Sequence, residues 1–399
     1  NLKLFNFLEI LTQIDDTNVK IVIDVTERWY FWPYPILEVS ERNFNSWWSE
    51  FSSSNYSDFS RLNYGVFFNW ENFRGRNELL LFKIRKGFKE HYLFSYQVPY
   101  FNQKKTIGIN TNLQLFRRKK SFYKTQENTL MYHTDGDNFT TKDYEFNTNL
   151  LYRKGVSTTH FLKFHHFLSS VDTAIVRKNP NYLFNGSNSS GSYSKITYQF
   201  KKENRDYVEY PLNGSYLHIE GTKYFKGSSP VEHFELLMQI ERHLELKNRF
   251  FIGSSFKSKW SSEGYQPYFS QEGFGFDDYV RGYEYYVVDG QDFWLSKTIL
   301  KYALIQKTNF DIPYIKMKQF SKSYYSLYLG FFSDMGYVID EQTNRENPLS
   351  NSILWGNGIS LDYVTYYDKL LRIEFSINHL GEKGLFLHFS NPFGSKKRL

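Results

Sequence analysis

One stretch of the sequence, FGFDDYVRGYEYYVVDGQDFW at residues 274–294, sets a single arginine among aromatic and acidic residues. The guanidinium of Arg281 is charged at every accessible pH, and burying it without a carboxylate partner is strongly unfavourable. The bulky aromatic neighbours indicate that this segment packs against another part of the chain. The chemistry predicted here is therefore a buried ion pair that holds a loop in place, and a carboxylate must be supplied from elsewhere.

Residue patterns that support catalysis do not occur. The sequence has no cysteine, no G-x-S-x-G motif and no glycine-rich phosphate loop after a predicted strand. Asp277 and Asp278 are adjacent and diverge, and the adjacent His165 and His166 point to opposite faces of a strand. We expect no enzyme activity, no cofactor and no metal. Two basic clusters, at 116–120 and 394–399, are typical of solvated turns, so we expect no nucleic-acid partner.

Composition indicates an all-β chain. Phe occurs 39 times, Tyr 33 times and Trp 8 times in 399 residues, and aromatic residues favour strands. Mean hydropathy is −0.56, and no apolar run approaches the roughly 18 residues of a membrane-spanning helix. These observations leave a soluble β protein or a transmembrane β-barrel.

Apolar and polar residues alternate along many segments. In residues 371–378 the apolar set is Leu371, Ile373, Phe375 and Ile377, and the polar set is Arg372, Glu374, Ser376 and Asn378. Such a strand has one apolar and one polar face. The alternation fits a soluble sandwich or a membrane barrel, and by itself does not choose between them.

The number of alternating segments favours the barrel. We count sixteen, each about ten residues long, an even number as membrane barrels require. Connections between them alternate between short and long, and the sixth long connection, residues 261–292, contains Arg281. The predicted strands are 62–70, 77–86, 89–98, 105–116, 121–132, 142–152, 158–168, 192–202, 214–225, 231–242, 249–260, 293–306, 323–334, 356–366, 369–379 and 384–392.

The thirteenth predicted strand offers a partner for the arginine. Its alternation places Asp334 on the polar face together with Phe332 and Gly336. Gly330 and Gly336 have no side chains and would leave room for a loop to approach the barrel wall. Arg372 and Glu374, inward on the fifteenth strand by the same parity, are second-rank partners.

In these motifs the sequence resembles the BamA-type outer-membrane assembly barrels. Val280, Arg281, Gly282 and Tyr283 match the Val-Arg-Gly-Phe/Tyr motif of that family's sixth loop. Phe332, Asp334 and Gly336 match its Phe-x-Asp-x-Gly motif on strand thirteen. The resemblance implies that the acid of this motif binds the loop arginine inside the barrel lumen.

Both ends of the chain extend the resemblance. Residues 24–48 look like the end of a POTRA domain and its entry into the barrel, and residues 384–393 resemble the aromatic-ended closing strand. The closing-strand signal consists of Leu385, Leu387, Phe389 and Phe393. The predicted fold is a 16-stranded antiparallel transmembrane β-barrel preceded by the C-terminal part of a small α/β POTRA domain. The predicted boundaries are 1–38 for the POTRA-like part, 39–393 for the barrel and 394–399 for a tail.

The resemblance implies a protein of the bacterial outer membrane, with its POTRA-like end in the periplasm. It would insert β-barrel proteins by pairing an incoming strand at the seam between its first strand, expected at 61–70, and its last. The implied partners are unfolded outer-membrane clients, membrane lipid, and accessory lipoproteins or other assembly subunits. Alternatives are a two-partner-secretion exporter that passes its client through the lumen, a passive channel and, more distantly, a soluble β-sandwich.

Overall fold

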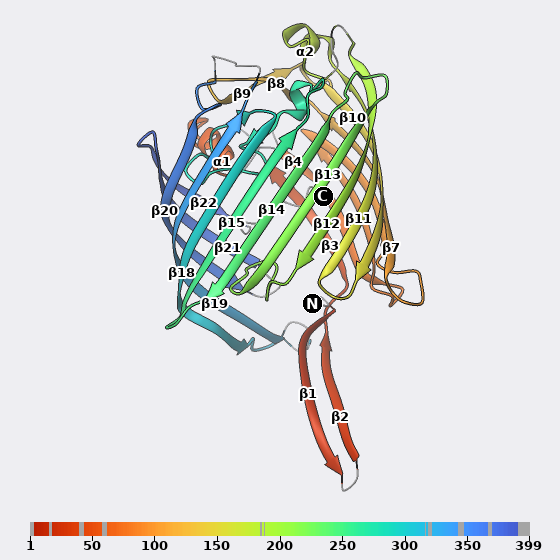
Figure 1. The fold of residues 1–399 in the computed structure, drawn as a ribbon, viewed down its shortest axis with the longest axis vertical. Coiled ribbons are helices and arrows are strands. Elements are labelled where there is room, and N and C mark those ends of the chain that lie inside the picture. The colour runs from red at the N-terminus through yellow and green to blue at the C-terminus, as the bar shows by residue number, and fades with distance from the viewer. Residues whose placement is uncertain are drawn as a thin grey trace.

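The computed structural model describes residues 4–15, 18–39, 44–57, 62–183, 186, 188–315, 317, 321–341, 347–365 and 369–389. Sixteen strands of this part form one antiparallel sheet that curls into a barrel (Figure 1). No helix in the same residues has the length and apolar character to cross a membrane. The chain is therefore all-β, in agreement with the composition.

The barrel strands follow one another around the sheet in chain order. They are β3 (Phe31–Val39), β4 (Leu62–Phe73), β5 (Glu78–Gly87), β6 (Lys89–Val98), β7 (Ile107–Arg118), β10 (Thr141–Lys154), β11 (Thr158–Val171), β12 (Ser190–Glu203), β13 (Gly214–Lys226), β14 (Phe234–Glu245), β15 (Phe250–Ser261), β18 (Asp292–Asp311), β19 (Lys322–Ile339), β20 (Ile353–Thr365), β21 (Lys369–Asn378) and β22 (Lys383–His388). The sheet ends at β3 and β22, and no ladder joins these two within the described residues.

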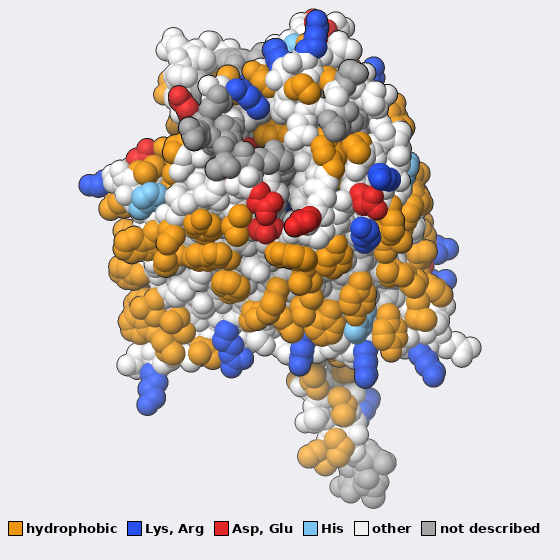
Figure 2. Space-filling model, turned by 45° about the horizontal axis from the view of Figure 1, so that its top comes forward, with side chains coloured by type: hydrophobic (Ala, Val, Ile, Leu, Met, Phe, Trp, Pro, Cys, Tyr) orange, Lys and Arg blue, Asp and Glu red, His pale blue; other side chains and the backbone are white. Residues whose placement is uncertain are grey.

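The alternation seen in the sequence separates the outside of the barrel from its lumen. On β21, Ile373 and Phe375 are exposed, whereas Arg372 and Glu374 are fully buried. Figure 2 shows exposed apolar side chains as a belt across the visible face of the barrel. An apolar outer face around a polar, buried interior is the arrangement of a membrane barrel. A sandwich would show the reverse, with its apolar face buried against a second sheet.

One predicted strand is not part of the barrel and one barrel strand was not predicted, so the count of sixteen is unchanged. Residues 121–132 do not form a barrel strand but the hairpin of β8 (Lys120–Gln126) and β9 (Thr129–Thr134), which pair with each other in a separate sheet. The two turn residues, Glu127 and Asn128, have φ of 51° and 55°, as a tight hairpin turn requires. The sequence pattern alone did not separate this hairpin from a continuous strand.

The first barrel strand is β3, which pairs with β4 along its whole length. It lies mostly within residues 1–38, where we had expected the end of a POTRA-like domain, so the boundary at residue 38 is wrong. The segment expected to be the first strand is β4, the second. Pro33 and Pro35 had indicated a break, but proline is compatible with a strand at the edge of a sheet.

Ahead of the barrel, β1 (Phe5–Asp15) and β2 (Asn18–Glu27) form a two-stranded sheet of their own. This hairpin projects from one end of the barrel (Figure 1). One of its faces carries paired apolar side chains that are exposed, including Leu8, Ile10 and Ile23. The sequence predicted the C-terminal part of an α/β POTRA domain here, and this hairpin by itself does not show one.

Besides the β8–β9 hairpin, several short elements outside the sheet lie in the connections at the opposite end. They are α1 (Phe44–Ser53), α2 (Thr173–Lys178), a short 3₁₀ turn at Tyr268–Ser270, β16 (Glu272–Phe274) and β17 (Val288–Asp289). The Asp172 side chain accepts a hydrogen bond from the backbone N–H of Ala174 at 2.7 Å and so caps α2. Helix α1 packs against the closing strand β22.

Asn128, at the tip of the β8–β9 hairpin, ties together three connections at this end of the barrel. Its side chain donates to the backbone oxygen of Val287 at 3.2 Å and accepts from the backbone N–H of Leu349 at 3.1 Å. Its own backbone N–H donates to Oδ1 of Asn347 at 3.0 Å. Because all these groups are buried, each bond spares a polar atom from being buried without a partner. The three connections therefore form one cap over this end of the barrel.

Within this cap, the carboxyl group of Asp289 makes the stability of the folded cap depend on pH. Burial, with a contribution from Asp340 and Glu272, raises the pKa of Asp289 to about 7, although hydrogen bonds from Thr125 and Tyr268 oppose the rise. A carboxyl whose pKa is raised on folding stabilises the folded form while protonated. That stabilisation is complete below its ordinary pKa near 3.8 and is lost as the pH rises through about 7.

We expect amide protection in the cap, corrected for intrinsic exchange rates, to be lower at pH 8 than at pH 5. Asp289→Asn should remove most of this difference, because the amide does not titrate. Hydrogen exchange measured by mass spectrometry over residues 265–290 checks this prediction. Equal protection at both pH values in the native chain would contradict it.

Candidate functional site

The long connection between β15 and β18 folds inward rather than out into solvent. Arg281, near its middle, has no exposed surface, and Asp334 on the inner face of β19 is equally buried. In sheet order β19 is the thirteenth strand. The structure therefore brings together the loop arginine and the strand acid that the two sequence motifs single out.

The two side chains meet in a bidentate ion pair. Nε of Arg281 donates to Oδ2 of Asp334 at 2.7 Å, and Nη2 donates to Oδ1 at 2.6 Å. The backbone N–H of Arg281 also donates to Oδ2, at 3.2 Å. Two parallel charge-assisted bonds of this kind fix orientation as well as distance. Asp334 thus holds both the side chain and the backbone of the loop.

Phe332 and Glu374 complete the surroundings of the guanidinium. The central carbon of the guanidinium lies 3.8 Å from the centre of the Phe332 ring, in a cation–π arrangement. Nη1 lies 3.7 Å from Oε1 of Glu374. Burial by itself would lower the pKa of Arg281, but the attraction of Asp334 raises it above its usual value. The arginine therefore remains charged at its buried position.

Glycines let the loop approach the wall. A Cβ atom placed on Gly336 would lie 2.6 Å from a ring carbon of Phe274, and one on Gly356 would lie 1.8 Å from the backbone oxygen of Arg281. Neither side chain could be accommodated without moving the loop. Gly330 has a different role, because its neighbours are Ser360 and Ile299 of the wall rather than the loop. Gly356 was not singled out from the sequence.

The rest of the loop motif is packed on both sides of the arginine. Val280 is fully buried in an apolar cluster with Phe274 and Leu354. Gly282 has φ of 94°, a conformation that favours glycine, and its backbone oxygen accepts from Asn378 at 3.0 Å. The hydroxyl of Tyr283 accepts from the backbone N–H of His379 at 3.3 Å. The loop is therefore bound to β20, β21 and the turn after β21 as well as to β19.

A second buried ion pair, between Arg372 and Asp362, lies deeper in the lumen. The sequence analysis did not predict this pairing. Nε and Nη2 of Arg372 donate to the two oxygens of Asp362, both at 2.6 Å. The hydroxyl of Tyr210 donates to the same carboxylate at 2.7 Å. Arg372 is thus not a partner of Arg281, while Glu374, 3.4 Å from Arg372 and 3.7 Å from Arg281, lies between the two arginines.

Asp362 could have been predicted as the partner of Arg372 from the sequence. The alternation of side chains along β20 places it on the lumen face, and it lies opposite Arg372 in the strand register. The contribution of Tyr210 had no sequence signal, because it depends on the turn between β12 and β13 folding into the barrel.

The described closing-strand residues share one face by parity: Leu385 and Phe389 are exposed, and Leu387 is partly buried. Phe386, which alternates with them, is buried, and its ring lies 5.4 Å from that of Tyr285 in the loop, at a tilted angle of 51°. Phe393 and the tail 394–399 lie outside the described residues. The inner face of the last strand is thus in contact with the arginine loop.

A sixteen-stranded barrel with a loop pinned in its lumen by an arginine defines the class of this protein. Solved structures with a similar fold include BamA from Haemophilus ducreyi lacking POTRA domains 1–3, at 14% identity and a TM-score of 0.62, with 97% of this chain and 76% of that chain covered. CdiB from Escherichia coli matches at 10% identity and a TM-score of 0.55, covering 95% of this chain and 66% of that one. CdiB from Acinetobacter baumannii matches at 12% identity and a TM-score of 0.50, covering 98% and 66%.

No family model matches the sequence, and the search of curated proteins finds no match. The structural likeness therefore carries the assignment: the chain has the fold of the BamA-type outer-membrane barrels. It spans about three quarters of the BamA chain and about two thirds of each CdiB chain.

We expect Arg281→Ala to release the loop, because it leaves Asp334 buried without its partner, at a cost of roughly 3–5 kcal/mol. The native chain has no cysteine, so Val280→Cys provides a single thiol at a fully buried position. Maleimide labelling of that thiol should be slow in the otherwise native chain and faster by at least an order of magnitude after Arg281→Ala.

The matched control is Arg117→Ala. Arg117 pairs with Glu90 at a partly exposed position on β7 and β6, where an ion pair contributes about 1 kcal/mol or less. Labelling at position 280 should not change in this variant. Equal labelling rates with and without Arg281 would show that the ion pair does not hold the loop.

Proposed function

We propose that this chain assists the insertion of β-barrel proteins into the bacterial outer membrane. The observation that carries the proposal is a barrel whose first and last strands, β3 and β22, are not joined by a ladder in the described residues. A strand edge with free backbone groups is a template for another strand. A client could add its strand there by backbone pairing, without nucleotide and without a catalytic residue.

The sequence of β3 supports a weak seam. Pro33 and Pro35 occupy alternate positions, so their backbone nitrogens face the same long edge of the strand. A proline facing β4 would remove a ladder hydrogen bond, and prolines in sheets are confined to edges that are not paired. The free edge of β3 therefore lacks two N–H donors. The other side of the seam, β22, has only six residues.

Occupation of the lumen favours lateral insertion over passage through the barrel. The arginine loop fills one part of it, and the turn that carries Tyr210 fills another, with Lys301 3.2 Å from the backbone oxygen of Pro211. An extended polypeptide would have to displace both segments and separate buried ion pairs. Strand addition at the seam needs neither movement.

The proposed setting follows from this function. The end that carries the β1–β2 hairpin would face the periplasm, and the apolar face of that hairpin would belong to a POTRA-like region that receives clients. Unfolded outer-membrane proteins would be the clients, and membrane lipid would surround the apolar belt of Figure 2. Accessory lipoproteins or other assembly subunits would bind this region.

Export of a polypeptide in the manner of two-partner secretion is the second candidate. The likeness to two CdiB structures at TM-scores of 0.55 and 0.50 favours it. It requires the arginine loop to leave the lumen during transport. The two functions therefore differ in what they require of the loop: export requires it to leave the lumen, whereas insertion can proceed with the loop in place.

A proline substitution tests the seam directly. Pro33→Val together with Pro35→Val would return two donors to the free edge of β3, each contributing about 1 kcal/mol when bonded. In lipid vesicles, we expect the native chain to accelerate folding of an unfolded outer-membrane barrel. The double variant should give an acceleration smaller by about thirtyfold, because the two bonds together make opening of the seam about 2 kcal/mol less favourable.

Pro99→Val is the control, since Pro99 lies in the turn after β6, away from the seam. It should accelerate client folding as the native chain does. Undiminished acceleration by the double variant would contradict insertion at this seam. No acceleration by the native chain, with passage of an unfolded client into the vesicle lumen instead, would favour export.

A further inference from the structure

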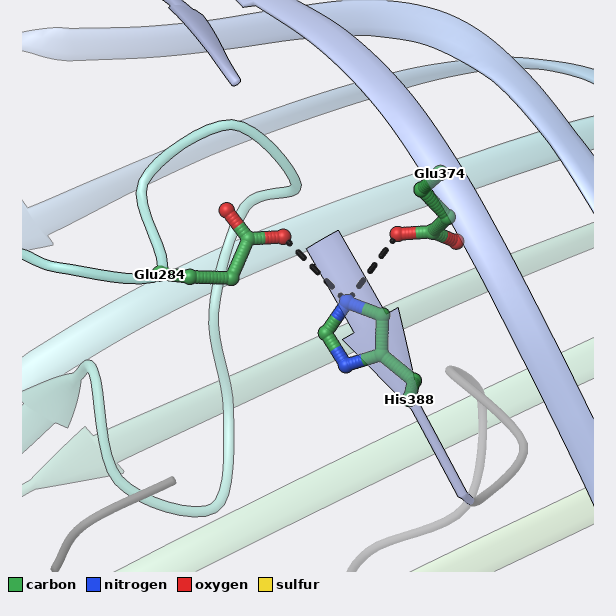
Figure 3. A group of neighbouring side chains, drawn as sticks. All are labelled: Glu284, Glu374 and His388. Atoms are coloured by element: carbon green, nitrogen blue, oxygen red, sulfur yellow. Dashed lines mark ion pairs between the residues drawn. The ribbon is translucent and has the colours of Figure 1, made fainter. Parts of the chain in front are cut away.

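Three ligand atoms converge between the arginine loop and the end of the barrel. They belong to Glu284 of the loop, Glu374 of β21 and His388 of β22, and we name them the Glu284–Glu374–His388 cluster (Figure 3). Within the described residues this is the one group of three or more His, Asp or Glu side chains spaced to hold a metal ion. The three residues are distant in sequence and meet only because the loop folds into the lumen.

The spacing in the cluster fits a metal ion better than direct hydrogen bonds. Nε2 of His388 lies 3.2 Å from Oε2 of Glu374 and 3.6 Å from Oε1 of Glu284. A charge-assisted N–H···O bond is shorter, at about 2.7–2.9 Å. Ligands about 2.0–2.2 Å from a tetrahedral zinc ion lie about 3.3–3.6 Å from each other. A small ion could thus enter with little movement of the side chains.

Buried atoms of the cluster also have unmet hydrogen-bonding capacity. Both carboxylate oxygens of Glu374 and Nε2 of His388 are buried and make no hydrogen bond, and Glu374 has no exposed surface. The two nearby arginines approach Oε1 of Glu374, at 3.4 and 3.7 Å. Its Oε2 therefore remains directed at His388. Buried polar atoms in this state are rare, and a missing ion is one of their ordinary explanations.

The remaining contacts orient the ligands. The ring of Tyr279 stacks on the imidazole of His388, with centres 5.8 Å apart and planes at 17°. Oε2 of Glu284 accepts the backbone N–H of Gly282 at 2.9 Å, so its other oxygen faces the cluster. Ligands that are held by such outer contacts bind metal more strongly than free ones.

We propose that the Glu284–Glu374–His388 cluster binds a divalent transition metal ion, with zinc as the best fit. One imidazole and two carboxylates form a donor set that suits zinc, and water can take the fourth position. Two carboxylates balance the charge of the ion, while Arg281 and Arg372 are balanced by Asp334 and Asp362. The bound ion would join the arginine loop, β21 and the closing strand β22.

The test uses the full chain in detergent, freed of metal by a chelator and titrated with Co²⁺ and then Zn²⁺. We expect one Co²⁺ per chain, with the visible absorption of a four-coordinate site, and its displacement by Zn²⁺. His388→Gln and Glu374→Gln should each weaken binding by at least about tenfold. The control is His166→Gln, at an exposed histidine of β11 that contacts Ser194 at 2.9 Å, and it should bind as the native chain does.

A second measurement on the native chain does not depend on how the variants fold. Zn²⁺ should slow amide exchange in β22 and in residues 279–286, because the ion would join these segments, while exchange in β11 stays unchanged. Unaltered exchange in these segments would overturn the proposal. The absence of stoichiometric Co²⁺ binding, or binding that His388→Gln leaves intact, would also overturn the proposal. The cluster would then consist of a protonated His388 that forms ion pairs with the carboxylates of Glu284 and Glu374.

Discussion

A fully buried guanidinium is the constraint on which the interior of this barrel depends. Arg281 has lost all contact with solvent, and a charge in that position persists only when a carboxylate and further hydrogen bonds replace the water. Asp334 supplies both bonds in a bidentate geometry, and Phe332 supplies the face of its ring. Glycines at 336 and 356 are required because the loop must come within contact distance of the wall for these bonds to form.

The consequences extend from strand thirteen to the end of the barrel. Once Arg281 is fixed, the residues that follow it reach β21 and β22, where Gly282 bonds Asn378 and Tyr285 meets Phe386. The loop therefore connects β19 and β20 of the barrel wall to β22, the shortest barrel strand among the described residues. An insertase that works at its seam would need such a connection, because the closing strand must be kept in position while one edge remains open to a client.

Alternation with a period of two predicted strands with one apolar and one polar face and the inward position of Asp334, and the number of such strands then favoured the barrel. It succeeded because inward and outward residues of a barrel face such different surroundings that the pattern is strict, as on β21. The alternation pattern failed where turn geometry or the position of a strand in the sheet determines the structure. Two residues with positive φ turn 121–132 back on itself as a hairpin, and β3 tolerates its prolines only because it is an edge.

Most tertiary contacts between distant segments could not be predicted from the sequence. Tyr210 reaches Asp362 across 152 positions, and Glu284 meets His388 only after the loop has entered the lumen. Neither contact has a local pattern, since each depends on how far a connection folds inward. The motifs around Arg281 and Asp334 gave the one long-range pair that could be anticipated, because a charged residue among aromatics requires a partner of opposite charge.

The most direct test is a double-mutant cycle on the ion pair between Arg281 and Asp334. The free energies of unfolding of Arg281→Ala, Asp334→Ala and the double variant are each compared with that of the native chain by urea unfolding in lipid vesicles. The cycle isolates the interaction between the two side chains from their separate effects. If the pair holds the interior together, the coupling energy should exceed about 2 kcal/mol, as close buried charge pairs can show. A coupling energy near zero, with additive single effects, would contradict the account.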